Sequence, residues 1–228
     1  MKYFDPNGEP IDCNQFIQKY SELYFKYYPQ NKIQNKETGD LIEDEINKKC
    51  TEGIFDFECV AWKIGRDYNE YKAKYDNGEP IPNGYGNLID GVKLKNFLNE
   101  ISNSHRLSTI FGEGDYSRSK IEEAFTILSA SAPPNFGTVY IITVMYFLSK
   151  GAIPIYDQFA HKAIKAIYFE KKPKEVYVGS APSKTEVTNA INMLDEYMWY
   201  LEKVFGTPHI ARDIDRALWV YGHPQIVK

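Results

Sequence analysis

Two short stretches in the second half of this 228-residue sequence carry residue types that chemistry could use. The first is Pro134-Asn135-Phe136-Gly137, which joins two predicted helices. Asparagine and glycine tolerate positive φ angles, so the turn can be sharp and leave the first amides of the next helix pointing outward. Such amides, at the positive end of a helix dipole, could hold a phosphate, although an ordinary corner between two helices fits the same sequence.

The second stretch is Ile153-Pro154-Ile155-Tyr156-Asp157, which ends twenty residues after Gly137. Its aspartate stands where the N-cap or the first turn of the next helix is expected. A capping carboxylate contributes about 1 kcal/mol and needs no chemistry to explain it. The two stretches together are therefore more specific than either one alone.

Together they resemble the helix-hairpin-helix DNA glycosylase superfamily. In that pattern a Leu-Pro-Gly-Val-Gly-type hairpin is followed by an apolar helix and then by Pro-(aliphatic)-Asp at the next helix start. Residues 132–138 take the place of the hairpin, and residues 153–157 take the place of the loop that ends in the catalytic aspartate. Residues 215–222 are similar to a late helix that ends in glycine, and the match covers about residues 117–222.

The resemblance implies a mostly α-helical, two-lobe fold and DNA as the partner. Hairpin amides near Asn135, Phe136, Gly137 and Thr138 would anchor a DNA phosphate without reading sequence. A target base would be flipped out of the stack into a cleft between lobes. Asp157 would then stabilise the cationic sugar, or activate water, as the N-glycosidic bond breaks.

Two departures from the family pattern narrow the expected activity. Val139 stands where bifunctional members have a lysine, so no Schiff base can form there. Three cysteines cannot supply a four-cysteine iron–sulfur cluster, and we expect neither a metal nor another cofactor. The sequence therefore predicts monofunctional hydrolysis by an aspartate. Alternatives are an inactive DNA-binding or protein-interaction module of the same fold, and a helical assembly protein that uses the 12–28 and 183–205 helices.

Other polar residues are weaker candidates for the site. Lys63 and Arg66 lie three apart at a predicted helix end, where they could contact DNA phosphate or only complement the helix dipole. His161 follows Asp157 by one helical turn and could bond it, although a plain boundary histidine is the commoner outcome.

The elements that must position these residues are helices. In the second half, Ser119-x-x-Glu122 predicts a capping box for a helix that ends near Ser131. Further helices are predicted over 137–150 (with Gly151 as an αL stop), over 156–168, after a second capping box at Ser183-x-x-Glu186, and over 210–221. The helices that carry Trp199 and Trp219 are expected to place both rings in the core.

The first half is less regular in sequence. Helices are predicted from about Asp12 to Tyr28, from an Asp40/Glu43 capping pair to near Cys50, and over 54–66. The glycine-rich stretch 67–91 is expected to be irregular, as a lobe boundary or binding loop. We expect one compact helical unit over 1–228, with a variable half 1–116 and a hairpin-bearing half 117–222.

Composition fits a folded, water-soluble chain, with 43% hydrophobic residues, 25% charged residues and a net charge of −4. Residues 117–172 hold seven basic and four acidic residues, which mildly favours phosphate binding by this segment. Cys13, Cys50 and Cys59 are widely spaced, which favours a reducing cytoplasm. The sequence shows neither a signal peptide nor a membrane-length apolar run, so no membrane partner is expected.

Overall fold

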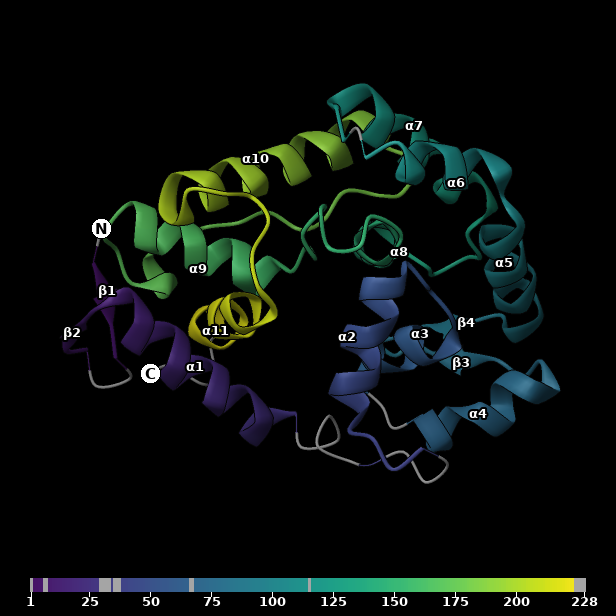
Figure 1. Cartoon of the computed structure of the whole chain (residues 1–228), viewed down its shortest axis with the longest axis horizontal. Helices are drawn as coiled ribbons and strands as arrows, with labels where there is room; N and C mark the ends of the chain where they lie inside the picture. Colours follow the sequence, from purple (N-terminus) through teal and green to yellow (C-terminus); the bar gives the residue numbers. More distant parts are fainter. Residues whose placement is uncertain are drawn as a thin grey trace. The chain divides into compact units, whose positions relative to one another are not determined.

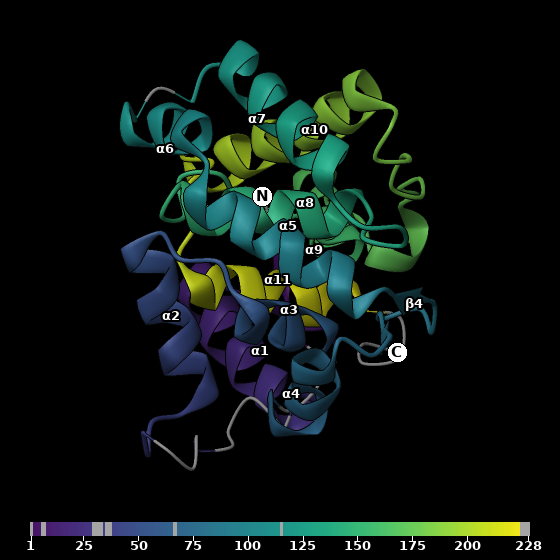
Figure 2. The ribbon, with the colours of Figure 1, turned by 90° about the vertical axis from the view of Figure 1, so that its right-hand side faces the viewer.

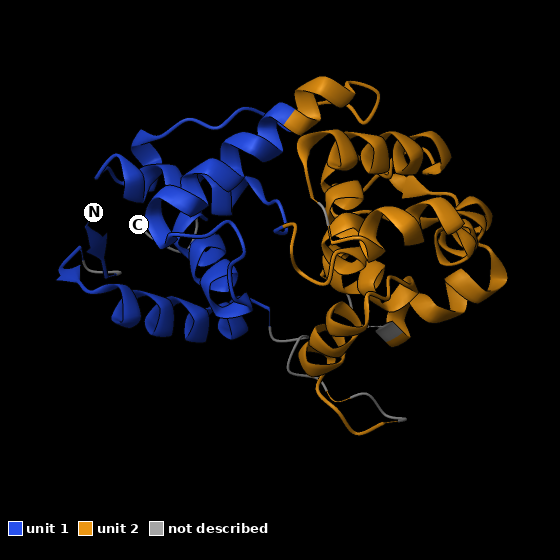
Figure 3. Cartoon of the chain, turned by 45° about the horizontal axis from the view of Figure 1, so that its top comes forward, with its two compact units in different colours: residues 1–28, 154–181, 192–228 blue, residues 29–153, 182–191 orange. Residues whose placement is uncertain are grey.

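The computed structural model describes residues 2–5, 8–28, 34, 38–65, 68–114 and 116–223. The chain divides into two compact units (Figure 3). Unit 1 contains residues 1–28, 154–181 and 192–228, and unit 2 contains residues 29–153 and 182–191. The chain thus returns to unit 1 just before Asp157, and none of its crossings between the units falls at residue 116 or within 67–91.

The described residues are mostly helical, as the sequence predicts (Figure 1). The elements of unit 1 are β1 (Tyr3–Phe4), β2 (Pro10–Ile11), α1 (Cys13–Tyr27), α9 (Gln158–Tyr168), the 3₁₀ turn η2 (Pro173–Glu175), α11 (Arg212–Gly222) and most of α10 (Val187–Phe205). The elements of unit 2 are α2 (Ile42–Glu52), α3 (Phe57–Ile64), α4 (Tyr68–Asn77), β3 (Ile81–Pro82), β4 (Leu88–Ile89), α5 (Gly91–Asn103), α6 (His105–Gly112), α7 (Arg118–Ser131) and α8 (Thr138–Leu148). Each strand pair is a short antiparallel ladder.

Unit 1 is built around α11, which packs against both α1 and α9. Helix α1 begins in a capping box, in which Asp12 and Gln15 each accept a hydrogen bond from the backbone N–H of the other. Its buried face meets α11 through rings, because the Phe16 and Tyr20 centroids lie 5.3 and 5.2 Å from that of Tyr221. Aromatic packing therefore ties the first segment of this unit to the last one.

Unit 2 is built around α8, which Figures 1 and 2 show at its centre with α2, α3, α5 and α7 around it. Ile141, Val144, Met145 and Phe147 of α8 are all fully buried. A helix that is apolar on nearly all sides must be enclosed in this way, which confirms the prediction of a central helix over 137–150. The helix ends at Leu148, and the chain leaves it through Lys150 and Gly151, which have φ angles of +55° and +83°.

The expectation of irregular structure over 67–91 was wrong. This segment contains α4 and the β3–β4 hairpin, because Asn83 organises the turn locally. Its side-chain Oδ1 accepts hydrogen bonds from the backbone N–H groups of Tyr85 and Asn87, at 2.9 and 3.0 Å. Glycines and asparagines thus form an ordered turn here rather than a loose loop.

Two predicted capping motifs were also wrong. Helix α7 begins at Arg118 with Ser117 as its N-cap, so Ser119 and Glu122 lie inside the helix. Helix α2 begins at Ile42 without a side-chain cap. The buried Glu43 instead accepts a hydrogen bond from Trp62 Nε1, at 3.1 Å.

The expectation for the two tryptophans was also inaccurate. Trp199 is 43% exposed and packs its ring beside Tyr168 and Tyr200, while Trp219 is half-buried. Within the part of the chain that the structure describes, no helix is long and apolar enough to cross a membrane.

Candidate functional site

The predicted hairpin is a tight turn between α7 and α8 in unit 2. The Phe136 N–H donates to the Pro133 carbonyl at 3.1 Å, and Asn135 has a φ of +66°. Asparagine is one of the few residues that adopts this left-handed conformation readily, which confirms the sharp turn expected from the sequence. Pro134 and Asn135 are exposed at its tip.

The β3–β4 hairpin holds this turn from one side without burying it. The Asn83 side chain donates to the carbonyl of Asn135 at 3.1 Å, and the Asn135 side chain donates to the carbonyl of Leu88 at 2.7 Å. The N–H of Gly84 donates to the Tyr140 hydroxyl at 3.0 Å. These bonds fix the backbone of the turn relative to the first turn of α8.

Two residues predicted to touch phosphate face inward instead. The Phe136 ring is fully buried, 5.1 Å from that of Phe97, and its N–H is used within the turn. Thr138 is buried too, and its hydroxyl donates to the carbonyl of Pro182 at 2.6 Å. Their side chains support the hairpin. Of these two residues, Thr138 alone keeps a backbone amide that a ligand could use.

The start of α8 leaves amides without an acceptor. Within the described parts of the chain, no carbonyl or side chain accepts from the N–H groups of Gly137, Thr138 or Val139. Gly137, the N-cap, has a φ of −84°, and a Cβ placed on it would meet nothing within 4 Å. The fold therefore does not require glycine here, but a glycine lets a ligand approach the backbone closely.

Lys184 is a cation beside the hairpin that the sequence did not single out. Its ammonium donates to the carbonyl of Ala132 and, at 3.0 Å, to that of Pro133. The only local signal was the adjacent Ser183-x-x-Glu186 motif, of which one half forms, because Glu186 accepts from the Ser183 N–H at 2.9 Å.

Lys63 lies in the last turn of α3, a helix that packs on α8, and Arg66 lies outside the described residues.

Asp157 is the N-cap of α9 in unit 1, as the sequence predicts. Its Oδ1 accepts the Phe159 N–H at 2.8 Å, and the residue is half-buried. No donor in the described ranges contacts Oδ2. One carboxylate oxygen is thus fixed by the helix and the other is available.

Four half-buried rings form a cluster in unit 1, and one of them, Phe159, donates its backbone N–H to this carboxylate. We call Tyr28, Phe159, Trp219 and His223 the aromatic cluster. Ring centroids are 4.9 Å apart for Tyr28 and Trp219, 4.5 Å for Phe159 and His223, and 4.9 Å for Trp219 and His223. Burial and then the Asp157 charge raise the pKa of Tyr28, while burial lowers the pKa of His223 against the opposing effect of Asp157. Tyr28 and His223 therefore lie within the electrostatic range of the carboxylate.

Gly222 makes this arrangement possible. A Cβ on Gly222 would lie only 1.9 Å from the carbonyl oxygen of Phe159, so the end of α11 contacts the start of α9 backbone to backbone. A glycine at this position is required sterically, and the sequence had singled it out only as the end of a late helix.

His161 does not bond the Asp157 side chain, contrary to the possibility raised above. Its imidazole is 1% exposed and its Nδ1 lies 3.2 Å from the Tyr156 hydroxyl, while Asp157 receives only the helical backbone bond from the His161 N–H. The cause is helix geometry, because the His161 side chain points into the core of unit 1 rather than along the helix towards Asp157.

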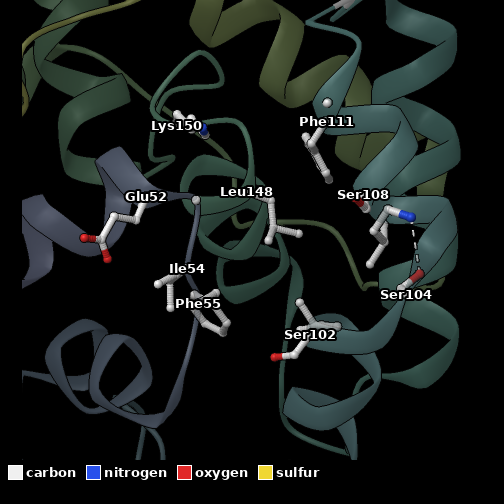
Figure 4. Close-up of a pocket in the computed structure, with 13 residues that line it drawn as sticks. Glu52, Ile54, Phe55, Ser102, Ser104, Ser108, Phe111, Leu148 and Lys150 are labelled. Carbon is white, nitrogen blue, oxygen red and sulfur yellow. Dashed lines mark hydrogen bonds between the residues drawn. The ribbon is translucent and has the colours of Figure 1, made fainter.

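A pocket of about 380 Å³ lies in unit 2, beside the end of α8 opposite the hairpin. Apolar side chains such as Phe55, Leu107 and Leu148 line it, with serines at its edge (Figure 4). Its charged lining residues are Glu52 and Lys150, and Figure 4 shows the Glu52 carboxylate pointing away from the apolar side chains. The pocket has no pair of groups suited to acid–base chemistry.

No protein-family model matches the chain, and the searches of curated proteins and of solved structures gave no match. The function of this protein is therefore inferred from the geometry of these residues.

Proposed function

We propose that this protein binds DNA through its hairpin and hydrolyses the N-glycosidic bond of a nucleotide with Asp157 as the essential carboxylate. The proposal depends above all on how the two carboxylate oxygens of Asp157 are bonded. Its Oδ1 is held by the first turn of α9, its Oδ2 has no donor among the described residues, and Phe159, which donates to Oδ1, belongs to the cluster of half-buried rings.

Breaking a glycosidic bond develops positive charge on the sugar, and a fixed carboxylate stabilises that charge. Water adds to the anomeric carbon as the bond to the base nitrogen breaks, and a proton from the water passes through Asp157 to the leaving base. Because Val139 cannot form a Schiff base, the reaction would stop at hydrolysis without cutting the strand.

The aromatic cluster supports base binding beside Asp157. Flat, half-exposed rings offer a flipped base a surface on which to stack, which offsets part of the cost of taking it out of the duplex. Each of the four rings lies in unit 1 with Asp157, on the end of α1, the start of α9 and the end of α11.

The hairpin supports DNA binding in unit 2. Three amides without an acceptor in the described chain, an N-cap open to close approach and the Lys184 ammonium beside the turn suit a phosphate. Such contacts position DNA without reading its sequence, so base choice would depend on the region around Asp157.

The test is base release from duplexes that carry damaged or mismatched bases, with the wild type beside Asp157→Asn. Asparagine caps a helix as well as aspartate does, so this variant should keep its stability and its DNA binding. Release should fall at least about 100-fold, because the stabilising charge is lost. Asp12→Asn is the matched control, since Asp12 caps α1 in the same unit.

An inactive binding module of the same fold is the second candidate, because the Phe159 N–H bond to Asp157 is also what a plain N-cap makes. Salt-sensitive DNA binding without base release by the wild type would favour this module. The absence of both at low ionic strength would contradict both proposals.

A further inference from the structure

Three buried aromatic side chains gather behind Asp157 in unit 1. We call Tyr156, His161 and Tyr197 the buried polar cluster. Each ring contacts the other two, with centroids 5.5 to 5.6 Å apart, and no side chain is more than 1% exposed. Tyr156 directly precedes Asp157, and His161 follows it by one turn of α9, so the cluster supports the aspartate from both sides along the chain.

The hydrogen bonds of this cluster are incomplete. The Tyr156 hydroxyl lies 3.2 Å from His161 Nδ1, whereas His161 Nε2 and the Tyr197 hydroxyl have no partner in the described residues. The carboxylate of Glu196 is 3.9 Å from His161 Nε2, which is too far for a direct hydrogen bond. Two polar atoms are thus buried without a bond, on rings that touch each other.

The charge state of His161 limits which hydrogen-bond partner its Nε2 can have. Burial is the main effect that lowers its pKa, to about 4, so the ring is neutral near pH 7. In either tautomer of the neutral ring, Nε2 is a donor or an acceptor that needs a partner, and a water molecule can be that partner in both cases. A buried polar atom without a partner is destabilising, and native proteins commonly satisfy such groups with internal water.

We propose that His161 Nε2 and the Tyr197 hydroxyl share one internal water molecule, and that Tyr197 is thereby a positioning residue for Asp157. The water would bond both Nε2 and the hydroxyl, and the Glu196 carboxylate, 3.9 Å from Nε2, is close enough to take part. The Tyr197 ring also lies 5.5 Å from that of Tyr156, the residue that directly precedes Asp157 in the chain. The shared water would therefore connect the support of α9 to the surroundings of the carboxylate.

The first test is the sign of a stability change. If the Tyr197 hydroxyl has no partner, Tyr197→Phe removes an unsatisfied group and leaves the Tm unchanged or higher. If the hydroxyl binds the shared water, the same change should lower the Tm by about 2–4 °C. Tyr200→Phe is the matched control, because Tyr200 lies on the same helix against His161 and its hydroxyl is not one of the buried atoms without a partner.

The second test is a double-mutant cycle. His161→Asn keeps a polar atom near the position of Nδ1 and removes Nε2. If both groups hold one water, the double variant with Tyr197→Phe should lose little more in Tm than either single variant. Additive losses would overturn the shared water.

The positioning role rests on the proposed function and has its own measurement. Tyr197→Phe should lower the kcat for base release roughly tenfold, which is the worth of one supporting hydrogen bond, and leave KM for the duplex unchanged. An unchanged kcat would overturn the positioning role. If the wild type releases no base, the proposed function fails, while the Tm cycle still decides whether the water exists.

Discussion

The first turns of α8 and α9 show two different ways to begin a helix. Every helix start leaves amides without partners inside the helix. In unit 1, α9 meets this need with its own carboxylate, because Asp157 accepts from the Phe159 N–H. In unit 2, α8 starts at Gly137, which has no side chain, and the next amides have no acceptor in the described chain. One helix start thus presents a negative oxygen and the other presents N–H donors suited to an anion.

The glycines of the two regions also differ in why a glycine is present. Gly222 is required by the fold, since a Cβ there would meet the Phe159 carbonyl oxygen at 1.9 Å. Gly137 has an ordinary φ of −84° and open space around its Cα. Glycine at Gly222 therefore serves packing, and glycine at Gly137 serves access.

Substituting these two glycines should produce the largest difference in the free energy of unfolding. Gly222→Ala should reduce the free energy of unfolding by at least about 3 kcal/mol, because α9 and α11 must move apart. Gly137→Ala should change it by less than about 1 kcal/mol, since only the N-cap preference is affected. Urea denaturation of both variants measures the difference, and equal losses would contradict the assignment of packing to one glycine and access to the other.

The buried histidine of unit 1 should make stability depend on pH. Burial holds the pKa of His161 at about 4 when folded, against an ordinary value of 6.5, and Glu196 and Lys165 act on it in opposite directions. Between these values the unfolded chain binds the proton and the folded chain does not. Stability should therefore fall as the pH drops from 6.5 to 4, by roughly 3 kcal/mol from this group.

Denaturant unfolding of the wild type and His161→Asn at pH 7, 5.5 and 4.5 would isolate this effect. The variant retains the titration of the carboxylates, so the difference between the two proteins reports the histidine alone. Parallel pH profiles would mean that the imidazole is not held neutral in the folded state.

The smallest expected effect is that of Lys184, whose ammonium lies beside the hairpin in unit 2. Lys184→Gln should reduce the dependence of log K on log salt for duplex DNA by about one, with a similar loss of affinity for every sequence. Lys203→Gln is a suitable control, because that ammonium lies over the Trp199 ring of unit 1. A slope identical to that of the wild type would remove Lys184 from the proposed phosphate contacts.

Local signals explain which predictions the structure confirms. The left-handed Asn135, the positive φ of Gly151 shortly after α8 and the N-cap role of Asp157 each depend on a few consecutive residues. The apolar run of α8 announces a buried helix in the same way. Such features are set by backbone sterics and by hydrogen bonds within one turn, which a sequence displays directly.

Three of the incorrect predictions concern residues whose surroundings are set by segments far along the chain. Glu43 bonds Trp62 instead of capping a helix, and the His161 ring packs against Tyr197 instead of bonding Asp157. Trp199 lies on an exposed face that helical periodicity alone could not distinguish from a core face. In each case, packing between elements decided the outcome.

By itself, the sequence determined that this protein is mostly helical, where α8 and α9 begin, and which residues form the sharp turn and the capping carboxylate. Only the tertiary structure decided that Lys184 lies against the hairpin, that Gly222 contacts the Phe159 backbone, and that rings at the ends of α1 and α11 form a cluster with Phe159, two residues after Asp157. The physical reason is range. Caps and turns are bonds between near neighbours in the chain, whereas a site is assembled from segments that only packing brings together.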